Sequence, residues 1–156
     1  MENSAVITRF YTAFSNSDAI EMISCYHDEA VFEDPAFGKL NRKEVAAMWK
    51  MLLERSKGNL KVAFKDVVSD ENSGAATWIA TYIFSQTNRK VVNTIHAEFE
   101  FKDGLILKHK DNFDIYKWSK QALGWKGFLL GWTPFMQNGI QQNAKKALSN
   151  YMQKNA

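Results

Sequence analysis

The sequence has few of the residues that cross-link small domains through disulfides or bind metal ions. Cys25 is the single cysteine among 156 residues, and there are three histidines, so neither an internal disulfide nor a structural zinc site is predicted. Phosphate-binding glycine loops, dinucleotide-binding motifs and nucleophile elbows are also missing, and no cofactor or metal is expected. Uninterrupted runs of about 18 apolar residues do not occur, which excludes a predicted membrane-spanning helix.

The sequence also lacks a large excess of positive over negative charge. Twenty Lys and Arg stand against seventeen Asp and Glu, a net charge of +3, and the basic residues occur in ones and twos, as at Arg42-Lys43. A nucleic-acid binder usually gathers its cations on one face, so no nucleic-acid partner is expected. The first residues lack a basic segment followed by an apolar core, so no secretory signal is predicted and the cytoplasm is the expected location.

Apolar residues make up 46% of the chain and aromatic residues 13%, which is sufficient for the core of one domain. In the first third they recur at helical spacing. Asp18 followed by Glu21, and Asn41 followed by Glu44, have capping-box spacing and predict the starts of the second and third helices. A short strand is expected between these two helices, ended by Pro35, which has no N–H for a ladder.

From residue 60 the apolar spacing changes from about 3.6 to 2, which predicts strands. They are expected over residues 60–64, 75–86, 90–101 and 105–118. Asp103-Gly104 is a hairpin signal, and short turns between the other strands predict an antiparallel meander. Helices first and a meander afterwards indicate an α+β fold, with the helices on one face of a curved antiparallel sheet.

The tail is predicted to be helical again from Lys117. Beyond Pro134 the apolar residues mark an amphipathic helix of about five turns. Its polar face is rich in Gln and Asn rather than Lys or Arg, so no membrane partner is expected. We therefore divide the chain into a domain over residues 1–118 and a helical extension over 119–156, packed on the same domain or on a second subunit.

Two chemically capable side chains are predicted on the apolar face of the last strand. Because alternate side chains of a strand point to opposite faces, His109 and Asp111 share a face with Leu107 and Phe113. A carboxylate in apolar surroundings holds a proton more readily, which suits general acid–base work near neutral pH. A structural pair, satisfied by backbone groups and buried water, is the alternative interpretation.

Asp34 is the third candidate, because it lies where the first strand ends, directly before Pro35. An aspartate in that position also forms turns, and this is the alternative. His96 falls on the polar side of its strand and is interpreted as solvated. Aromatic side chains are expected either to line a pocket for a small apolar molecule or to form plain core, and the expected lining residues are Phe10, Phe14, Trp49, Trp78, Tyr82 and Phe113.

The strand predicted over residues 75–86 is apolar on both faces. Trp78 and Tyr82 lie on one face, and Ile79 and Ile83 lie on the other. A sheet covered on one side alternates more cleanly between apolar and polar residues. We therefore expect a homodimer that forms through the sheet.

Two stretches, YHDEAVFEDP over residues 26–35 and FKDGLI followed by HKD over 101–111, resemble the nuclear transport factor 2-like superfamily. It includes ketosteroid isomerases, SnoaL-like polyketide cyclases and limonene epoxide hydrolases, and the resemblance covers residues 4–116. It implies a cone-shaped domain, usually dimeric, with a ligand cavity between the helices and the concave sheet. It also implies that His109 and Asp111 occupy strand positions that point into that cavity.

The same resemblance places Asp34 in the segment where the isomerases hold their general-base aspartate. Other positions depart from the isomerase pattern. The isomerase tyrosine on the first helix falls on Phe10, and Tyr11 is expected to point about 100° away from it. The second donor of the isomerases falls at or beside Ala97, so a steroid isomerase reaction is not expected.

These observations predict a small-molecule pocket protein of the SnoaL-like type, and two functions stay open. One is a cofactor-independent acid–base enzyme, of the isomerase, cyclase or hydratase kind, acting on an apolar or polycyclic substrate. Asp111 would be its general acid or base, His109 the partner of Asp111, and Asp34 a second polar group at the cavity mouth. The other is a non-catalytic ligand-binding or protein-interaction domain.

Overall fold

A computed structural model of the chain describes residues 2–156. The helices are α1 (Asn3–Ser15), α2 (Ala19–Ser24), α3 (Arg42–Ser56), α4 (Ile115–Leu123), α5 (Trp125–Leu130) and α6 (Pro134–Lys154). The strands are β1 (Tyr26–Asp34), β2 (Gly38–Asn41), β3 (Lys61–Ser69), β4 (Ser73–Phe84), β5 (Arg89–Lys102) and β6 (Leu105–Asn112). Helices before and after one sheet confirm the predicted α+β class.

The strands form one sheet in the order β2-β1-β6-β5-β4-β3. Strands β3 to β6 are consecutive antiparallel neighbours, as the turn signals predict. Strand β1, however, runs parallel to β6, so the sheet is mixed rather than antiparallel throughout. Hairpins force a strand to reverse its direction, but helix α3 separates β2 from β3 at opposite edges of the sheet, and a crossover through a helix leaves the direction free.

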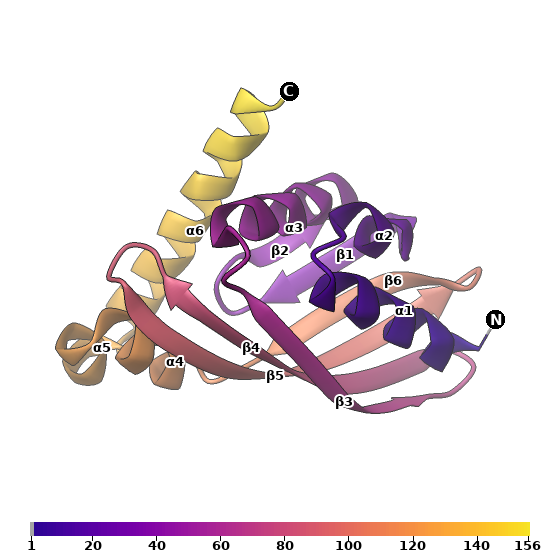
Figure 1. The fold of residues 1–156 in the computed structure, drawn as a ribbon, viewed down its shortest axis with the longest axis horizontal. Helices are drawn as coiled ribbons and strands as arrows, with labels where there is room; N and C mark the ends of the chain where they lie inside the picture. Colours follow the sequence, from indigo (N-terminus) through magenta and orange to yellow (C-terminus); the bar gives the residue numbers. More distant parts are fainter. Residues whose placement is uncertain (1) are drawn as a thin grey trace.

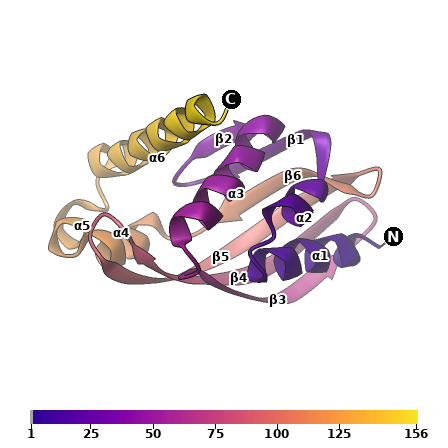
Figure 2. The same cartoon turned by 45° about the horizontal axis from the view of Figure 1, so that its top comes forward.

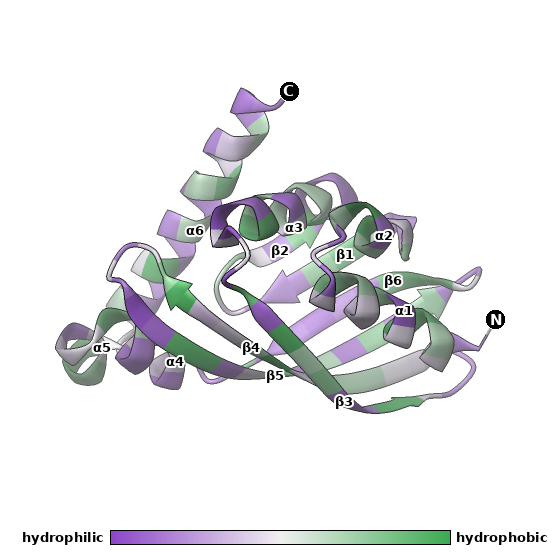
Figure 3. Ribbon diagram, viewed as in Figure 1, coloured by the Kyte–Doolittle hydropathy of each residue, from purple (hydrophilic) through white to green (hydrophobic). Residues whose placement is uncertain are grey.

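Helices α1, α2 and α3 cover the concave face of the curved sheet (Figures 1 and 2). Both predicted caps form: the Asp18 carboxylate accepts a hydrogen bond from the Glu21 backbone N–H at 3.0 Å, and Asn41 with Glu44 makes a complete capping box. Strand β5 shows the alternation expected of a sheet with one buried face, with apolar and polar residues taking turns along it (Figure 3). The core therefore lies between this face and the three helices.

The C-terminal helices cover an unpaired edge of strand β5 and add side chains to the core. Strand β6 pairs with β5 only from His96 onward, and α4 lies along the open remainder, where the Gln121 side chain accepts a hydrogen bond from the Val92 N–H at 2.8 Å. Such cover protects exposed strand edges from pairing with other chains. Helix α6 packs beside α3 (Figure 2) and contributes Leu148 to the main core. Residue 119, the predicted start of the extension, lies inside α4, and that division stays a prediction.

Among the described residues, no helix is both long enough and apolar enough to cross a membrane.

Candidate functional site

Strand β6 presents His109 and Asp111 to the helices. Both side chains are buried, with 1% and 2% of their surface exposed. His109 stands opposite Phe99 on β5 and Phe32 on β1, so an aromatic ring flanks it on each neighbouring strand. The expected face holds for these two residues.

Leu107 does not follow the same alternation. It is half-buried, whereas Ile106 beside it is fully buried. The cause is an irregularity in the pairing of β5 with β6 between Glu100 and Phe101, which shifts the register by one residue. The inward face of β6 therefore changes parity between residues 106 and 109.

A chain of hydrogen bonds runs through the buried pair. The Trp49 indole N–H donates to the Tyr26 hydroxyl oxygen at 3.1 Å, and that hydroxyl lies 2.7 Å from His109 Nδ1. On the other side of the ring, His109 Nε2 lies 2.9 Å from Asp111 Oδ1, which also accepts the Trp78 indole N–H at 3.3 Å.

The direction of these bonds follows from their donors. The Tyr26 oxygen already accepts from Trp49, so its own proton is free to be donated to His109 Nδ1. His109 then carries its proton on Nε2 and donates it to the Asp111 carboxylate. The His109 imidazole and the Trp78 indole thus hold the Asp111 carboxylate in place, and the Trp49 indole acts on it only through Tyr26 and His109.

The Asp111 carboxylate reaches a large cavity between the sheet, α3 and the tail. The cavity has a volume of about 690 Å³ and is lined mainly by apolar side chains, which is a size typical of small-molecule sites. His109 is not among its lining residues and lies behind Asp111. No hydrogen bond from a described residue reaches Asp111 Oδ2, which leaves that oxygen for a ligand.

Most of the expected aromatic residues line this cavity, and their names are Phe14, Trp49, Trp78, Tyr82 and Phe113. Phe10 does not. It is fully buried one layer further in, with its ring 5.5 Å from the His109 ring and 5.6 Å from the Tyr26 ring. Its place in the expected lining is therefore corrected: on α1 it supports the buried histidine.

Asp34 lies at the end of β1 and lines the same cavity as Asp111. Its Oδ1 accepts the backbone N–H groups of Ala36 at 3.0 Å and Phe37 at 2.6 Å, so the turn-forming role is real. Burial raises the pKa of Asp34 to about 7, the charge of Asp111 adds to the rise, and the two N–H bonds oppose it. The structure thus brings together two carboxyl groups whose surroundings differ.

The family assignment comes from comparison with known proteins. The family model described as a SnoaL-like domain matches residues 7–109. The chain belongs to the SnoaL-like family. No curated protein sequence matches it.

Solved structures share the fold of this SnoaL-like protein. Bal32a, from a soil-derived mobile gene cassette, has a TM-score of 0.67 at 19% identity, covering 76% of this chain and 95% of that one. An LEH-like epoxide hydrolase of M. tuberculosis has a TM-score of 0.60 at 22% identity, covering 81% and 92%. A candidate polyketide cyclase of Xanthomonas campestris has a TM-score of 0.62 at 16% identity, covering 76% and 95%. At these identities the likeness shows the fold, which confirms the resemblance inferred from the motifs.

The tail of the SnoaL-like protein lies outside the matched range and still helps to form the cavity. The Trp118 indole N–H on α4 donates to the Tyr82 hydroxyl at 2.7 Å. Burial raises the pKa of Tyr82, the bond from Trp118 opposes the rise, and the charge of Asp34 adds to it. The proton of Tyr82 is left free to meet a ligand. Side chains of α6, among them Asn143, complete the wall.

Two tyrosines of the site carried no distinct signal in the sequence. Tyr26, noted there only as part of a motif, joins His109 to Trp49, and burial raises its pKa well above the ordinary value. Tyr11, expected to point about 100° away from Phe10, is also fully buried, and its ring lies 6.0 Å from that of Trp78. Its hydroxyl has no hydrogen-bond partner among the described residues.

The remaining candidates lie apart from the cavity. His96 is exposed on the outer face of β5, where its ring lies 3.2 Å from the Thr77 hydroxyl, as its parity predicts. Cys25 is buried, and burial raises its pKa to about 11. Within residues 2–156, no three His, Cys, Asp or Glu side chains gather where a metal ion could bind.

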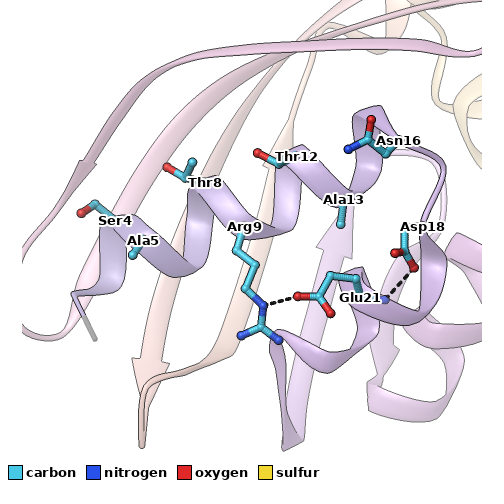
Figure 4. Close-up of a pocket in the computed structure, with 9 residues that line it drawn as sticks. All are labelled: Ser4, Ala5, Thr8, Arg9, Thr12, Ala13, Asn16, Asp18 and Glu21. Carbon is cyan, nitrogen blue, oxygen red and sulfur yellow. Dashed lines mark hydrogen bonds and ion pairs between the residues drawn. The ribbon is translucent and has the colours of Figure 1, made fainter.

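A second hollow, of about 540 Å³, lies along the outer side of α1 (Figure 4). Its charged groups already have partners: Arg9 forms an ion pair with Glu21, and Asp18 caps α2. The other lining side chains are short, such as Thr8 and Thr12. This hollow lacks the free buried groups that distinguish the cavity around Asp111.

Proposed function

We propose that this protein is a cofactor-independent acid–base enzyme acting on an apolar molecule of about two to four fused rings. The observation that carries the proposal is the pair of carboxyl groups in one largely apolar cavity of about 690 Å³. The Trp78 indole and the His109 imidazole hold Asp111 by hydrogen bonds, whereas burial raises the pKa of Asp34 to about 7. Carboxyl groups with unlike surroundings can serve as base and acid in one reaction.

In the proposed reaction, Asp111 Oδ2 removes a proton from a carbon next to a ring carbonyl. The electron pair moves onto the carbonyl oxygen, and protonated Asp34 or the Tyr82 hydroxyl donates a hydrogen bond to that oxygen. In a substrate with a carbon–carbon double bond beside the deprotonated carbon, return of the proton from Asp111 to the far carbon of that bond shifts the double bond, restores the carbonyl and completes an isomerisation without a cofactor. His109 is a positioning residue in this scheme, because it lies behind Asp111 and holds Oδ1.

The test is hydrogen–deuterium exchange of 1-tetralone, a fused two-ring ketone, followed by NMR in D₂O. We expect the protein to catalyse exchange beside the carbonyl, and Asp111→Asn to slow it by about 100-fold or more, since positioned acid–base groups contribute about 10² to 10⁴. The variant keeps an acceptor for Trp78, so quenching of tryptophan fluorescence should show unchanged binding of the ketone. Asp28→Asn, at an exposed aspartate, is the matched control.

One observation favours the alternative of a ligand-binding domain without catalysis. The chain from Trp49 through Tyr26 and His109 to Asp111 is satisfied within the protein, as expected of a structural polar network. If 1-tetralone binds but its exchange is no faster than with Asp111→Asn, the enzyme proposal is wrong and this alternative gains.

We also propose that the protein forms a homodimer through the outer face of its sheet. Support comes from apolar side chains on that face: Val68 is 61% exposed and Val92 42% exposed, with half-buried Ile79 between their strands. Sedimentation equilibrium should give twice the chain mass of 17.9 kDa. Val92→Lys should give the monomer mass, and a monomeric native protein would contradict the proposal.

A further inference from the structure

Helix α5 packs in the reverse of the usual manner, with its small residues inside and its large apolar residues outside. Gly127 and Gly131 lie so close to Ser119 of α4 that neither position has room for a side chain. The contact between the two helices is thus made by the α5 backbone. The large side chains of α5 and the following turn face away from the protein.

These outward residues form a continuous stretch, which we call the α5 patch. It consists of Trp125, Phe128, Leu129, Leu130, Trp132 and Phe135, all at least 47% exposed. Phe135 is 88% exposed and Trp125 is 70% exposed. Soluble monomers rarely expose so many large apolar residues together, and such a patch marks a surface that binds something.

The charge of the tail is as unusual as its apolar surface. From Ile115 to Ala156 there are six lysines and no acidic residue, so the preceding 114 residues carry fourteen basic and all seventeen acidic side chains. Two of the lysines lie beside the α5 patch. Lys126 Nζ is 5.9 Å from the Trp125 ring, and Lys120 Nζ is 4.8 Å from the ring of Tyr116, whose hydroxyl donates to the Phe128 carbonyl.

We infer that the α5 patch binds the surface of an anionic lipid bilayer. Exposed Trp, Phe and Leu next to Lys is the composition of segments that lie in the headgroup region, where the rings enter the interface and the lysines meet anionic headgroups. The inference departs from the expectation of no membrane partner, which rested on the Gln- and Asn-rich face of α6. It concerns surface binding, since α5 has six residues and cannot span.

A second copy of the chain fits the patch less well. Symmetric pairing of two such patches would bring Lys120 and Lys126 of one copy towards those of the other, with no acidic residue in either tail to neutralise them. Lysine is also depleted in the cores of protein interfaces. An anionic lipid surface instead matches both the apolar side chains and the cations.

Binding at this surface would also place the cavity next to the lipid. Phe135 belongs to the α5 patch and lines the cavity. An apolar ligand dissolved in the bilayer would then reach the cavity without crossing water. This consequence rests on the proposed function, whereas the lipid binding itself is measured without any ligand.

The experiment is co-sedimentation of the full chain with vesicles of phosphatidylcholine alone or with 30% phosphatidylglycerol. We expect binding to the anionic vesicles that weakens as salt is added. Replacing Lys120 and Lys126, together with the exposed Lys117 that also lies on α4, by Gln should lower the partition coefficient by about 100-fold, from about fivefold per lysine. Trp125→Ser with Phe128→Ser should lower it by about tenfold or more.

Matched controls use exposed residues away from the tail. Replacing Lys39, Lys61 and Lys65 by Gln removes the same charge from exposed strand positions and should leave the partition coefficient within about twofold. Ile20→Ser removes an apolar side chain that is 79% exposed and should do the same. Thermal unfolding checks that all variants fold, as their exposure predicts.

Three results would overturn the inference. The first is failure of the native chain to bind anionic vesicles, and the second is equal loss of binding in the control variants. The third is a lipid-free dimer, seen by sedimentation equilibrium, that Trp125→Ser with Phe128→Ser converts to monomer without any vesicle binding by the native chain. In that case the α5 patch is a subunit interface.

Discussion

The surroundings of Asp34 shift its pKa in two opposing directions. Burial beside the charge of Asp111 favours the neutral acid, whereas the N–H groups of Ala36 and Phe37 favour the carboxylate. The first influence is stronger and raises the pKa to about 7, compared with about 3.9 in an unfolded chain. Between these two pH values the folded protein holds a proton that the unfolded chain has lost. Stability must therefore fall as the pH rises through this window.

Asp34→Asn should remove this pH dependence, because the amide oxygen still accepts both N–H bonds and carries no charge. Above pH 7 the native chain bears the full cost of an ionised Asp34, and below pH 4 it bears none. The variant should therefore gain roughly 2 kcal/mol of stability relative to the native chain between pH 5 and pH 8. Urea unfolding at both pH values measures this difference. An equal difference at both, or the same change in Asp28→Asn, would show that Asp34 ionises normally.

Residue-level prediction from sequence succeeded where alternation along a strand was sufficient. It placed His109 and Asp111 on one buried face. It could not identify Tyr26 as a partner of His109, because 83 residues separate them and the contact depends on the parallel pairing of β1 with β6. Tyr11 was not identified as a core residue for a related reason. The buried face of α1 is wide enough that a side chain about 100° from Phe10 is still inside the core.

At the scale of helices and strands, short sequence motifs predicted the features that depend only on neighbouring residues, namely helix starts and a tight hairpin. Capping residues fixed the starts of α2 and α3, and Asp103-Gly104 fixed the last hairpin. Strand direction across α3 and the register irregularity before Ile106 depend on how distant strands meet, and neither left a signal in the sequence. Helix α5 shows the same limit, since apolar residues usually predict a buried face, and here glycines take the buried positions.

For the whole molecule, the tail and the body share one core. Leu148 of α6 is 3% exposed and belongs to the same buried cluster as Trp49 on α3. The cavity wall is likewise shared, because side chains of α4 and α6 line it together with those of β4. A continuous core favours unfolding as one cooperative unit, although the family match ends at residue 109.

Leu148→Ala tests whether the tail and the body unfold together. Truncating a buried leucine costs about 2 to 5 kcal/mol, and the position of α6 at the rim of the core places the expected cost near 2 kcal/mol. For a chain of this length that lowers the Tm by about 4 to 8 °C. Near- and far-ultraviolet circular dichroism should report one coincident transition. Leu129→Ala, at a leucine that is 54% exposed, should change the Tm by about 1 to 2 °C at most. If Leu148→Ala instead melts the helical signal early and leaves the aromatic transition in place, residues 119–156 are a separate unit.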